Sequence, residues 1–279
     1  MIGSMREASE AVTDSKVADV KSLFDTHVNE GKVIVVVEGD DDAVVYKKVM
    51  NAEAVCFYPD CDCDKHAVIL DALNGRYGNR LIAIKDADFD RLEGITYPYP
   101  NLMLTDTHDL ESMIVTDCLP ELQGDDAARC AGVTITPIYG ELEDISYLKW
   151  YNHSNHTCLI FKGIIPDMDF AAYFNTVVAK TSTKRAVTVT LADIESFKAS
   201  NTGADEKQIT NGHDIFERVY VQAKPTNGAN FPKKPFFQRL RRAYPGDKFV
   251  NTALYQAIKS WEISNGVSIL AVVQHPNVP

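Results

Sequence analysis

Carboxylates follow short apolar runs in the first half of this chain at a spacing suited to binding a metal ion. Glu38 and Asp42 follow one such run, and Asp86 and Asp88 follow another. Residues i and i+2 of an extended backbone point the same way, so we expect Asp86 and Asp88 to aim at one point. Two carboxylates ~4 Å apart repel by about 4 kcal/mol at an effective dielectric of about 20, and a divalent cation removes that cost. Oxygen ligands without Cys or His select Mg²⁺, Mn²⁺ or Ca²⁺ rather than zinc.

A third group of acids, Asp106, Asp109 and Glu111, follows the apolar residues 101–104. Asp106 or Thr107 is expected to cap a helix that begins here, because short polar side chains accept hydrogen bonds from the free N–H groups of a first turn. Aspartates after strands are often caps or turn formers, so each acid taken singly favours a structural role. Taken together, the three groups predict a metal site.

The elements that must position these acids are the strands of a parallel sheet. The run at 33–37 is unbroken and β-branched, as in a strand buried on both faces. Gly39 is expected to give the backbone freedom to turn and to approach a ligand closely. Further strand-like segments at 54–58, 81–84 and 101–104 alternate with helical patterns, which predicts an α/β fold with a mostly parallel sheet flanked by helices. In such sheets ligands bind at the carboxyl ends of the strands.

The second half of the chain has a mainly helical pattern. Thr190, with Asp193 three residues later, predicts a capping box at the start of one helix. Helices are expected at 141–151, 190–199, 213–222, 236–244 and 252–265, and two short strands at 157–161 and 187–189. We therefore predict three regions, which are an extension at 1–31, an α/β core at 32–130 and a mainly helical region at 131–279.

Composition narrows the possible functions. Six cysteines in 279 residues do not make a disulfide scaffold, so a reducing, cytoplasmic setting is expected. No apolar run approaches the length of a membrane span, and the N-terminus lacks the apolar core of a signal peptide. The net charge of −11 argues against nucleic-acid binding through bulk positive charge. Cys61, Cys63 and His66 match no common zinc spacing and predict an exposed loop.

One basic stretch, residues 233–242, reads KKPFFQRLRR and contains no acid. Five cations with two phenylalanines could follow a phosphate backbone, and the same pattern fits an amphipathic helix with a solvated basic face. The candidate nucleic-acid contacts are Lys233, Lys234, Arg239, Arg241 and Arg242.

The segments VVVEGDDDAVVY and LIAIKDADFD resemble the TOPRIM fold of topoisomerases, primases and OLD-type nucleases, with a Glu-Gly after the first strand and an Asp-x-Asp after the third. Later segments extend the resemblance over about residues 30–270. TDTHDLESMIV, LKW, LIFKGI, NGHDIFERV and LRRAY…FVNTALYQAIKSWE are similar to the OLD-like TOPRIM nuclease family, which includes the TOPRIM effector of the PARIS anti-phage system.

This resemblance implies a divalent-metal-dependent nuclease or toxin effector that uses Mg²⁺ or Mn²⁺, is paired with an ABC-type ATPase, and forms a homodimer. Glu38 resembles the TOPRIM glutamate, and Asp86 and Asp88 the Asp-x-Asp pair, while Asp42 and Glu111 are further candidate ligands. The family also uses a lysine, for which Lys149 and Lys162 both lie in matching segments. The chain contains no G-x-x-x-x-G-K-[ST], so ATP hydrolysis would belong to a partner.

Three other functions remain open at this stage. A signalling receiver domain fits poorly, because it needs one phosphoacceptor aspartate after the third strand, where this chain has DADFD. A phosphohydrolase with an aspartyl nucleophile normally carries Asp-x-Asp after its first strand, where this chain has Glu-Gly. A non-catalytic subunit that keeps the fold and binds a partner is the third alternative. The sequence does not distinguish DNA, RNA or tRNA as the substrate.

Overall fold

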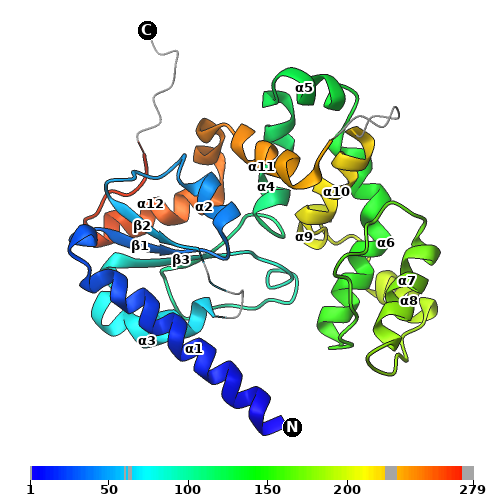
Figure 1. Ribbon diagram of the computed structural model, residues 1–279, viewed down its shortest axis with the longest axis horizontal. Helices are drawn as coiled ribbons and strands as arrows, with labels where there is room; N and C mark the ends of the chain where they lie inside the picture. The colour runs from blue at the N-terminus through cyan, green and yellow to red at the C-terminus, as the bar shows by residue number, and fades with distance from the viewer. Residues whose placement is uncertain (1, 60, 62–64, 224–230, 272–279) are drawn as a thin grey trace. The chain divides into compact units, whose positions relative to one another are not determined.

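The computed structural model describes residues 2–59, 61, 65–223 and 231–271, with side chains from residue 14 onward (Figure 1). The chain forms two compact units, which are described separately. The first comprises residues 1–86, 96–106 and 244–279, and the second comprises residues 87–95 and 107–243. The units are therefore interleaved along the chain, whereas the sequence analysis places one boundary near residue 130.

The first unit contains a four-stranded, all-parallel sheet with strand order β2-β1-β3-β4. The strands are β1 (Val33–Val36), β2 (Val55–Tyr58), β3 (Leu81–Lys85) and β4 (Leu102–Leu104). All four residues of β1 and all five of β3 are buried, which is why their sequences are continuously apolar or nearly so. The predicted α/β fold with a parallel sheet is confirmed.

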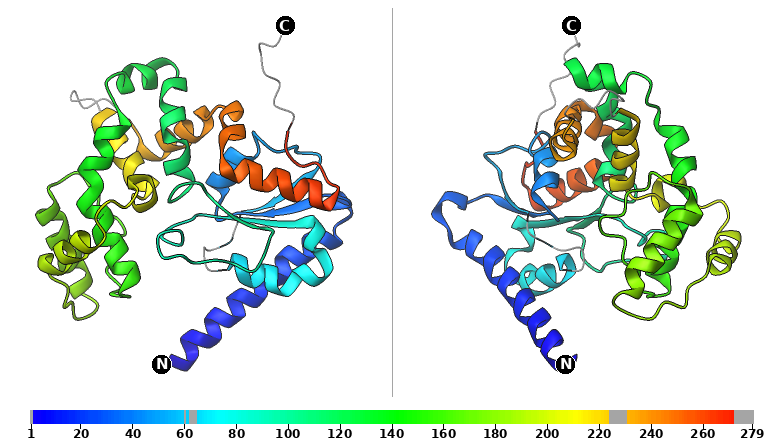
Figure 2. Two further views of the ribbon diagram at one scale, coloured as in Figure 1. Left: turned by 180° about the vertical axis from the view of Figure 1, so that it is seen from behind. Right: turned by 45° about the vertical axis from the view of Figure 1, so that its right-hand side comes forward.

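Helices cover both faces of this sheet. Figures 1 and 2 show α1 (Ile2–Asp25) and α3 (His66–Tyr77) on one face, and α2 (Asp40–Tyr46) and α12 (Ala253–Asn265) on the other. Three 3-10 turns, η1 (His27–Asn29), η2 (Gly78–Arg80) and η4 (Gly246–Asn251), complete the described part of the unit. The last helix of the chain is thus part of the sheet unit.

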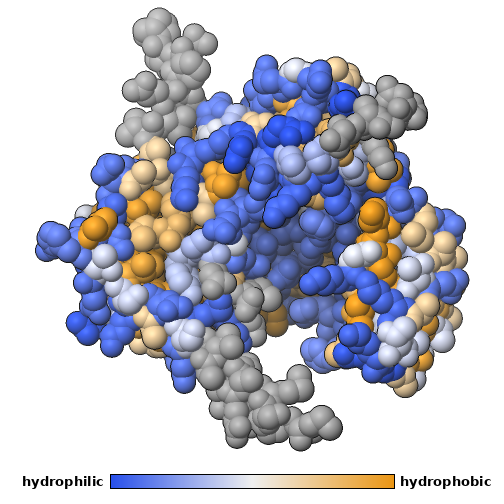
Figure 3. All heavy atoms as spheres, in the orientation of Figure 1, coloured by the Kyte–Doolittle hydropathy of each residue, from blue (hydrophilic) through white to orange (hydrophobic). Residues whose placement is uncertain are grey.

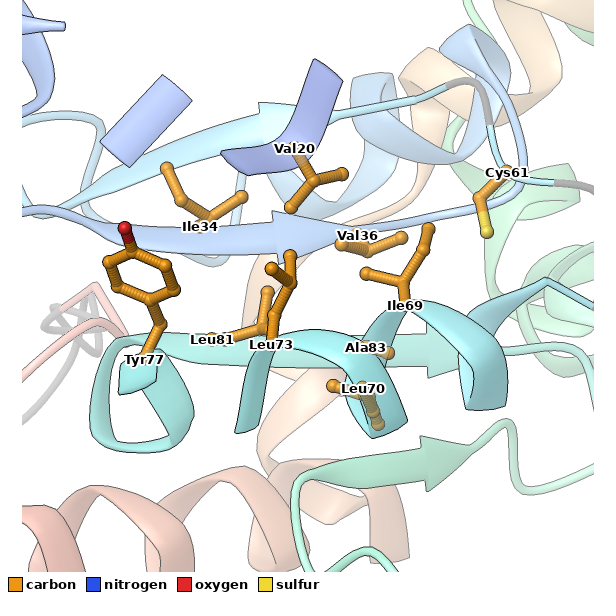
Figure 4. Packing of buried hydrophobic residues seen from close by; sticks show 10 residues of the cluster. All are labelled: Val20, Ile34, Val36, Cys61, Ile69, Leu70, Leu73, Tyr77, Leu81 and Ala83. Carbon is orange, nitrogen blue, oxygen red and sulfur yellow. The ribbon is translucent and has the colours of Figure 1, made fainter. Parts of the chain in front are cut away.

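The core between the sheet and α1 and α3 follows from strand pleating (Figure 4). Alternate residues of a strand face the same side, so Ile34 and Val36 of β1 lie beside Leu81 and Ala83 of β3. They pack against a row of apolar residues on the helices, namely Val20, Ile69, Leu70, Leu73 and Tyr77. Each fully buried aliphatic side chain contributes on the order of 2 kcal/mol, so this layer fixes the strands that carry Glu38 and Asp86.

The described part of the second unit is helical. Its α-helices are α4 (Leu110–Cys118), α5 (Gly124–Cys130), α6 (Ile135–Ser154), α7 (Phe170–Ser182), α8 (Leu191–Ser200), α9 (Glu206–Ile209), α10 (Gly212–Ala223) and α11 (Lys233–Ala243), with one 3-10 turn, η3 (Leu119–Glu121). The predicted capping box is confirmed, since the Asp193 N–H donates to Thr190 Oγ1 (3.3 Å) and the Thr190 N–H donates to Asp193 Oδ2 (2.8 Å).

The strands expected at 157–161 and 187–189 were wrong, because both segments lack regular structure. Cys158 has a φ of 56°, which no extended strand adopts. The N–H groups that a sheet partner would have bound find side chains instead. The Leu159 N–H donates to Asn152 Oδ1 (2.6 Å) and the Ile160 N–H donates to Thr181 Oγ1 (2.9 Å).

The surface in Figure 3 is mostly hydrophilic, with apolar residues in separate patches. Among the described residues, the exposed large apolar side chains are Val28, Val68, Ile95, Met168 and Ile263. Single exposed apolar residues of this kind are normal on a folded protein. No helix in the described part of the chain is long and apolar enough to span a membrane.

Candidate active site

Glu38 and Asp86 lie together at the carboxyl edge of the parallel sheet. Chain direction and register bring the ends of β1 and β3 side by side, since Val36 pairs with Ala83. The Asp86 N–H donates to Glu38 Oε1 (3.3 Å). The Glu38 backbone is also held, because its carbonyl accepts a hydrogen bond from the Cys61 N–H (3.2 Å). The two acids therefore lie at one edge of the sheet in the first unit, and their convergence on one divalent ion stays a prediction.

A lysine lies beside this pair. Lys85, the last residue of β3, is only 5 % exposed, and its Nζ donates to the Asp86 carbonyl oxygen (2.9 Å). The Lys85 carbonyl accepts from the Thr105 N–H (3.0 Å), which fixes the strand end. A buried ammonium near acidic residues offsets part of the repulsion between carboxylates.

Asp42 has a structural role in the first turn of α2. Its Oδ2 accepts a hydrogen bond from the Gly39 N–H (2.9 Å). Gly39 has an extended backbone, with a φ of −148°, so the predicted need for glycine flexibility was wrong. A Cβ at Gly39 would meet its nearest described atom, Asp42 Oδ2, at 3.9 Å, which is an ordinary contact. The fold does not demand glycine here.

Asp88 belongs to the second unit and does not continue the strand. Its φ is 45°, so the expected extended Asp-x-Asp geometry was wrong. The Asp88 N–H donates to the His108 carbonyl oxygen (2.6 Å), and Asp88 Oδ1 lies 3.9 Å from His108 Nε2. A left-handed aspartate costs about 1 kcal/mol or more, and such outliers gather at functional sites.

His108 is a residue that the sequence analysis missed. Its ring is buried, and Nδ1 lies 3.0 Å from the Gln208 carbonyl oxygen. A carbonyl only accepts, so Nδ1 carries a hydrogen and Nε2 faces Asp88. Burial lowers the pKa of His108, and the Lys149 ammonium lowers it further, whereas the Asp88 carboxylate raises it. In the segment TDTHDLE this histidine directly precedes Asp109, the residue that caps a helix, and this position is the sequence signal that could have pointed to it.

The structure separates the two candidate lysines. Lys149 forms a buried ion pair with Asp214, and its charge reaches His108. Lys162 is exposed, and its carbonyl accepts a hydrogen bond from the Lys180 ammonium. Lys149 is therefore the lysine that lies near the histidine facing Asp88.

The acids of the third group, Asp106, Asp109 and Glu111, cap helices or pair with an arginine. Asp109, not Asp106 or Thr107, caps α4, and its Oδ1 accepts from the Ser112 N–H (2.8 Å). Asp106 instead caps α12, accepting hydrogen bonds from two N–H groups of its first turn (2.6 and 2.8 Å). Glu111 is buried in an ion pair with Arg241, so its carboxylate already has a cation.

The basic stretch forms α11, and its charges are mostly paired within the second unit. Lys233 pairs with Glu217, Arg239 with Asp126, and Arg241 with Glu111. Arg241 is 6 % exposed, so the prediction that it contacts nucleic acid was wrong. Lys234 and Arg242 are exposed. The amphipathic-helix interpretation accounts for most of this stretch.

The sequence predicts an exposed loop around Cys61 and Cys63. Cys63 lies outside the described residues, and Cys61 is buried, so the prediction was wrong at Cys61.

A group of three or more His, Cys, Asp or Glu side chains arranged for a metal ion is absent from the part of the chain that is described. Glu38 and Asp86 still fit Mg²⁺, which keeps several waters and binds through one or two carboxylates together with substrate phosphates. The first unit also has a cavity of about 610 Å³ lined by Asn74, Asn101 and Trp261. It lies near the amino ends of β3 and β4, away from these acids.

The chain matches no family model, no curated protein and no solved structure. The TOPRIM resemblance thus depends on the motifs of the sequence itself, together with a sheet of the class that they imply.

Proposed function

We propose that this chain is a divalent-metal-dependent TOPRIM nuclease that hydrolyses phosphodiester bonds in DNA or RNA. The observation that carries the proposal is the meeting of Glu38 and Asp86 at the carboxyl edge of an all-parallel sheet, where the Glu38 carboxylate accepts the Asp86 N–H. Such an edge is the usual ligand site of open α/β sheets. Its donors are carboxylate oxygens, which suit Mg²⁺ or Mn²⁺.

Each residue has a distinct role in this proposal. A bound Mg²⁺ or Mn²⁺ would polarise the scissile phosphate and lower the pKa of a water molecule. Glu38 and Asp86 would hold the ion through their carboxylates, and Lys85 would limit the repulsion between them. The resemblance also gives a role to a lysine, for which Lys149 and Lys162 of the second unit are the candidates, and in that unit Asp88 Oδ1 lies 3.9 Å from His108 Nε2.

The test compares Glu38→Gln and Asp86→Asn with the natural chain and with Asp40→Asn, an exposed acid in the same helix turn as Asp42. Purified proteins are incubated with plasmid DNA and total tRNA in Mg²⁺, Mn²⁺ or EDTA. We expect at least a 100-fold loss of cleavage for Glu38→Gln and Asp86→Asn and no change for Asp40→Asn. Mn²⁺ should also raise the melting temperature of the natural chain and of Asp40→Asn, but not of the two site variants.

Undiminished Mn²⁺-dependent cleavage by Glu38→Gln and Asp86→Asn would contradict the proposal. A Mn²⁺-induced rise in melting temperature without cleavage would favour the alternative of a non-catalytic, metal-binding subunit. Cleavage of small phosphate esters but not of nucleic acid would instead favour a phosphohydrolase.

The partners belong to the same proposal. An ABC-type ATPase would control the nuclease, and two copies would form a homodimer, as the resemblance implies. Leu254, Ile258 and Trp261 of α12 are buried, so they offer a dimer no exposed apolar surface. Light scattering should give a mass of about twice 31.0 kDa, and an ATPase should co-purify with the tagged chain.

A further inference from the structure

Five separate sequence segments, one of which is α7 with Tyr173, meet around one cavity within the second unit. The cavity has a volume of about 410 Å³, which is within the usual range for small-molecule sites. Lys149 comes from α6, residues 161–165 from the loop before α7, Asp214 and Glu217 from α10, and Lys233 from α11. These positions fall in the LKW, LIFKGI, NGHDIFERV and KKPFFQRLRR stretches of the sequence.

The cavity is positively charged in an otherwise acidic chain. Three lysines and two carboxylates line it, which leaves one net positive charge, whereas the whole chain carries −11. Asp214 is paired with Lys149, and Glu217 Oε1 accepts from Lys233 Nζ (2.6 Å). The remaining cationic group is Lys162, which is exposed at the cavity together with His213, whose side chain is 59 % exposed. An anion is therefore the ligand that this opening attracts.

Two buried polar atoms in the lining lack a hydrogen-bond partner among the described residues. These are Glu217 Oε2, which can only accept from a ligand, and the Tyr173 hydroxyl. Burial raises the pKa of Tyr173, and the nearby Asp214 raises it further, so the phenol keeps its proton and remains a donor. Leaving such groups unsatisfied costs about 1–3 kcal/mol each, which a ligand with both donors and acceptors would recover.

The same cavity offers an apolar surface. Phe161, Ile164 and Ile165 lie in its lining beside the charged groups. A molecule with an anionic group, hydroxyl donors and a flat apolar ring matches all three features. We propose that this cavity binds a mononucleotide, with the phosphate at Lys162 and His213 and a sugar hydroxyl on Glu217. The cavity contains neither Glu38 nor Asp86, although both candidate lysines of the nuclease, Lys149 and Lys162, line it, and its binding test does not require nuclease activity.

The test measures binding by isothermal titration calorimetry with the full chain in EDTA, so that no metal site contributes. The probes are AMP, adenosine, inorganic phosphate and a short 5′-phosphorylated single-stranded oligonucleotide. We expect saturable binding of AMP, with adenosine and phosphate each at least 10-fold weaker. The oligonucleotide distinguishes the source of the nucleotide, because comparable affinity for it would assign the site to a strand end and weaker affinity to a free nucleotide.

Four variants show whether AMP binds at this cavity. Lys162→Ala and Glu217→Gln should each weaken AMP binding by at least 10-fold. Lys184→Ala removes an exposed lysine of the same unit that does not line the cavity, and it should bind as the natural chain does. Glu38→Gln should also bind AMP normally, so failure of the nuclease proposal leaves this one standing. Absence of AMP binding at millimolar concentration, or equal binding by Lys162→Ala and Lys184→Ala, would overturn it.

Discussion

Asp109 is a residue whose surroundings strongly change its pKa. It is 4 % exposed, and burial raises its pKa to about 7, with the Glu111 carboxylate as the next cause. Hydrogen bonds from the Ser112 and Gly212 N–H groups act in the opposite direction, because they favour the charged form. Asp109 therefore connects the starts of α4 and α10 through a carboxyl group that titrates near neutral pH.

This arrangement predicts how stability depends on pH. An aspartate of the unfolded chain titrates near ~3.9, so the folded state holds this proton more tightly. The stabilisation from Asp109 is fully present below about pH 4, falls as the pH rises, and is lost above about pH 7. In Asp109→Asn the unfolding free energy should fall less steeply between pH 4.5 and 7, by up to about 1.4 kcal/mol per pH unit. Urea denaturation at several pH values measures this slope.

The control for this experiment is Asp125→Asn, which removes an exposed acid of α5 in the same unit. Its pH slope should equal that of the natural chain. In Asp109→Asn the amide that replaces the carboxylate offers one acceptor oxygen instead of two, so this variant is expected to be less stable at every pH. The slope, rather than the absolute stability, is therefore the informative quantity, and an unchanged slope would contradict the assignment.

At the scale of elements, the contact between α4 and α10 depends on a glycine. A Cβ on Gly212 would lie 2.3 Å from Asp109 Oδ1 and from the Ser112 N, and 2.5 Å from Glu111 Cβ. All three neighbours belong to the capped start of α4 and cannot move away cheaply. Gly212→Ala should therefore destabilise the chain by at least about 2 kcal/mol.

Gly140 provides a matched control for this substitution. It lies inside α6, and no described atom outside its own helix backbone lies within 4 Å of a Cβ placed there. Alanine is a better helix former than glycine, so Gly140→Ala should stabilise the chain by about 0.5–1 kcal/mol. Thermal melting of both variants tests the pair, and similar effects of the two substitutions would contradict the crowding at Gly212.

The elements that the sequence predicted correctly are those with local causes. The β-branched run of β1 and the capping box at Thr190 determine their own structure, so pattern and propensity suffice. The errors have non-local causes. The segment at 157–161 has apolar residues, but side chains of α6 and α7 bind its N–H groups. Likewise, Glu111 is an ordinary helix acid in the sequence, and only folding brings Arg241 to it.

In the candidate site too, residues placed by strand direction were predictable, and residues placed by contacts with distant segments were not. Glu38 and Asp86 were predictable together, because strand direction alone places both at one edge of the sheet. The left-handed Asp88 was not predictable, since its conformation depends on a hydrogen bond with His108, 20 residues further along the chain. Likewise, only folding brings Lys149 to Asp214 and near His108.

At the scale of the molecule, the sheet unit includes α12, a helix that follows the whole second unit in the sequence. Leu254, Ile258 and Trp261 of α12 are all at most 6 % exposed. Backbone hydrogen bonds join Asn51 to Ile269 (2.7 Å) and Ala271 to Val49 (2.9 Å). A single boundary near residue 130 would cut these residues away from the sheet that they cover.

A piece comprising residues 1–130 should therefore fail to fold cooperatively, although it contains all four strands. It lacks α12, so the face of the sheet that α2 and α12 cover loses much of its cover, and Asp106 loses the helix that it caps. We expect a broad thermal transition, ANS binding and rapid proteolysis, as for a compact state with exposed apolar surface.

The variant Ile258→Ala of the full chain is the matched comparison, because it removes part of the same contact and leaves the chain intact. It should lose about 2–5 kcal/mol of stability and still unfold in one transition. If the 1–130 piece instead melts sharply at the temperature of the full chain, α12 is dispensable and the sheet is a domain in its own right.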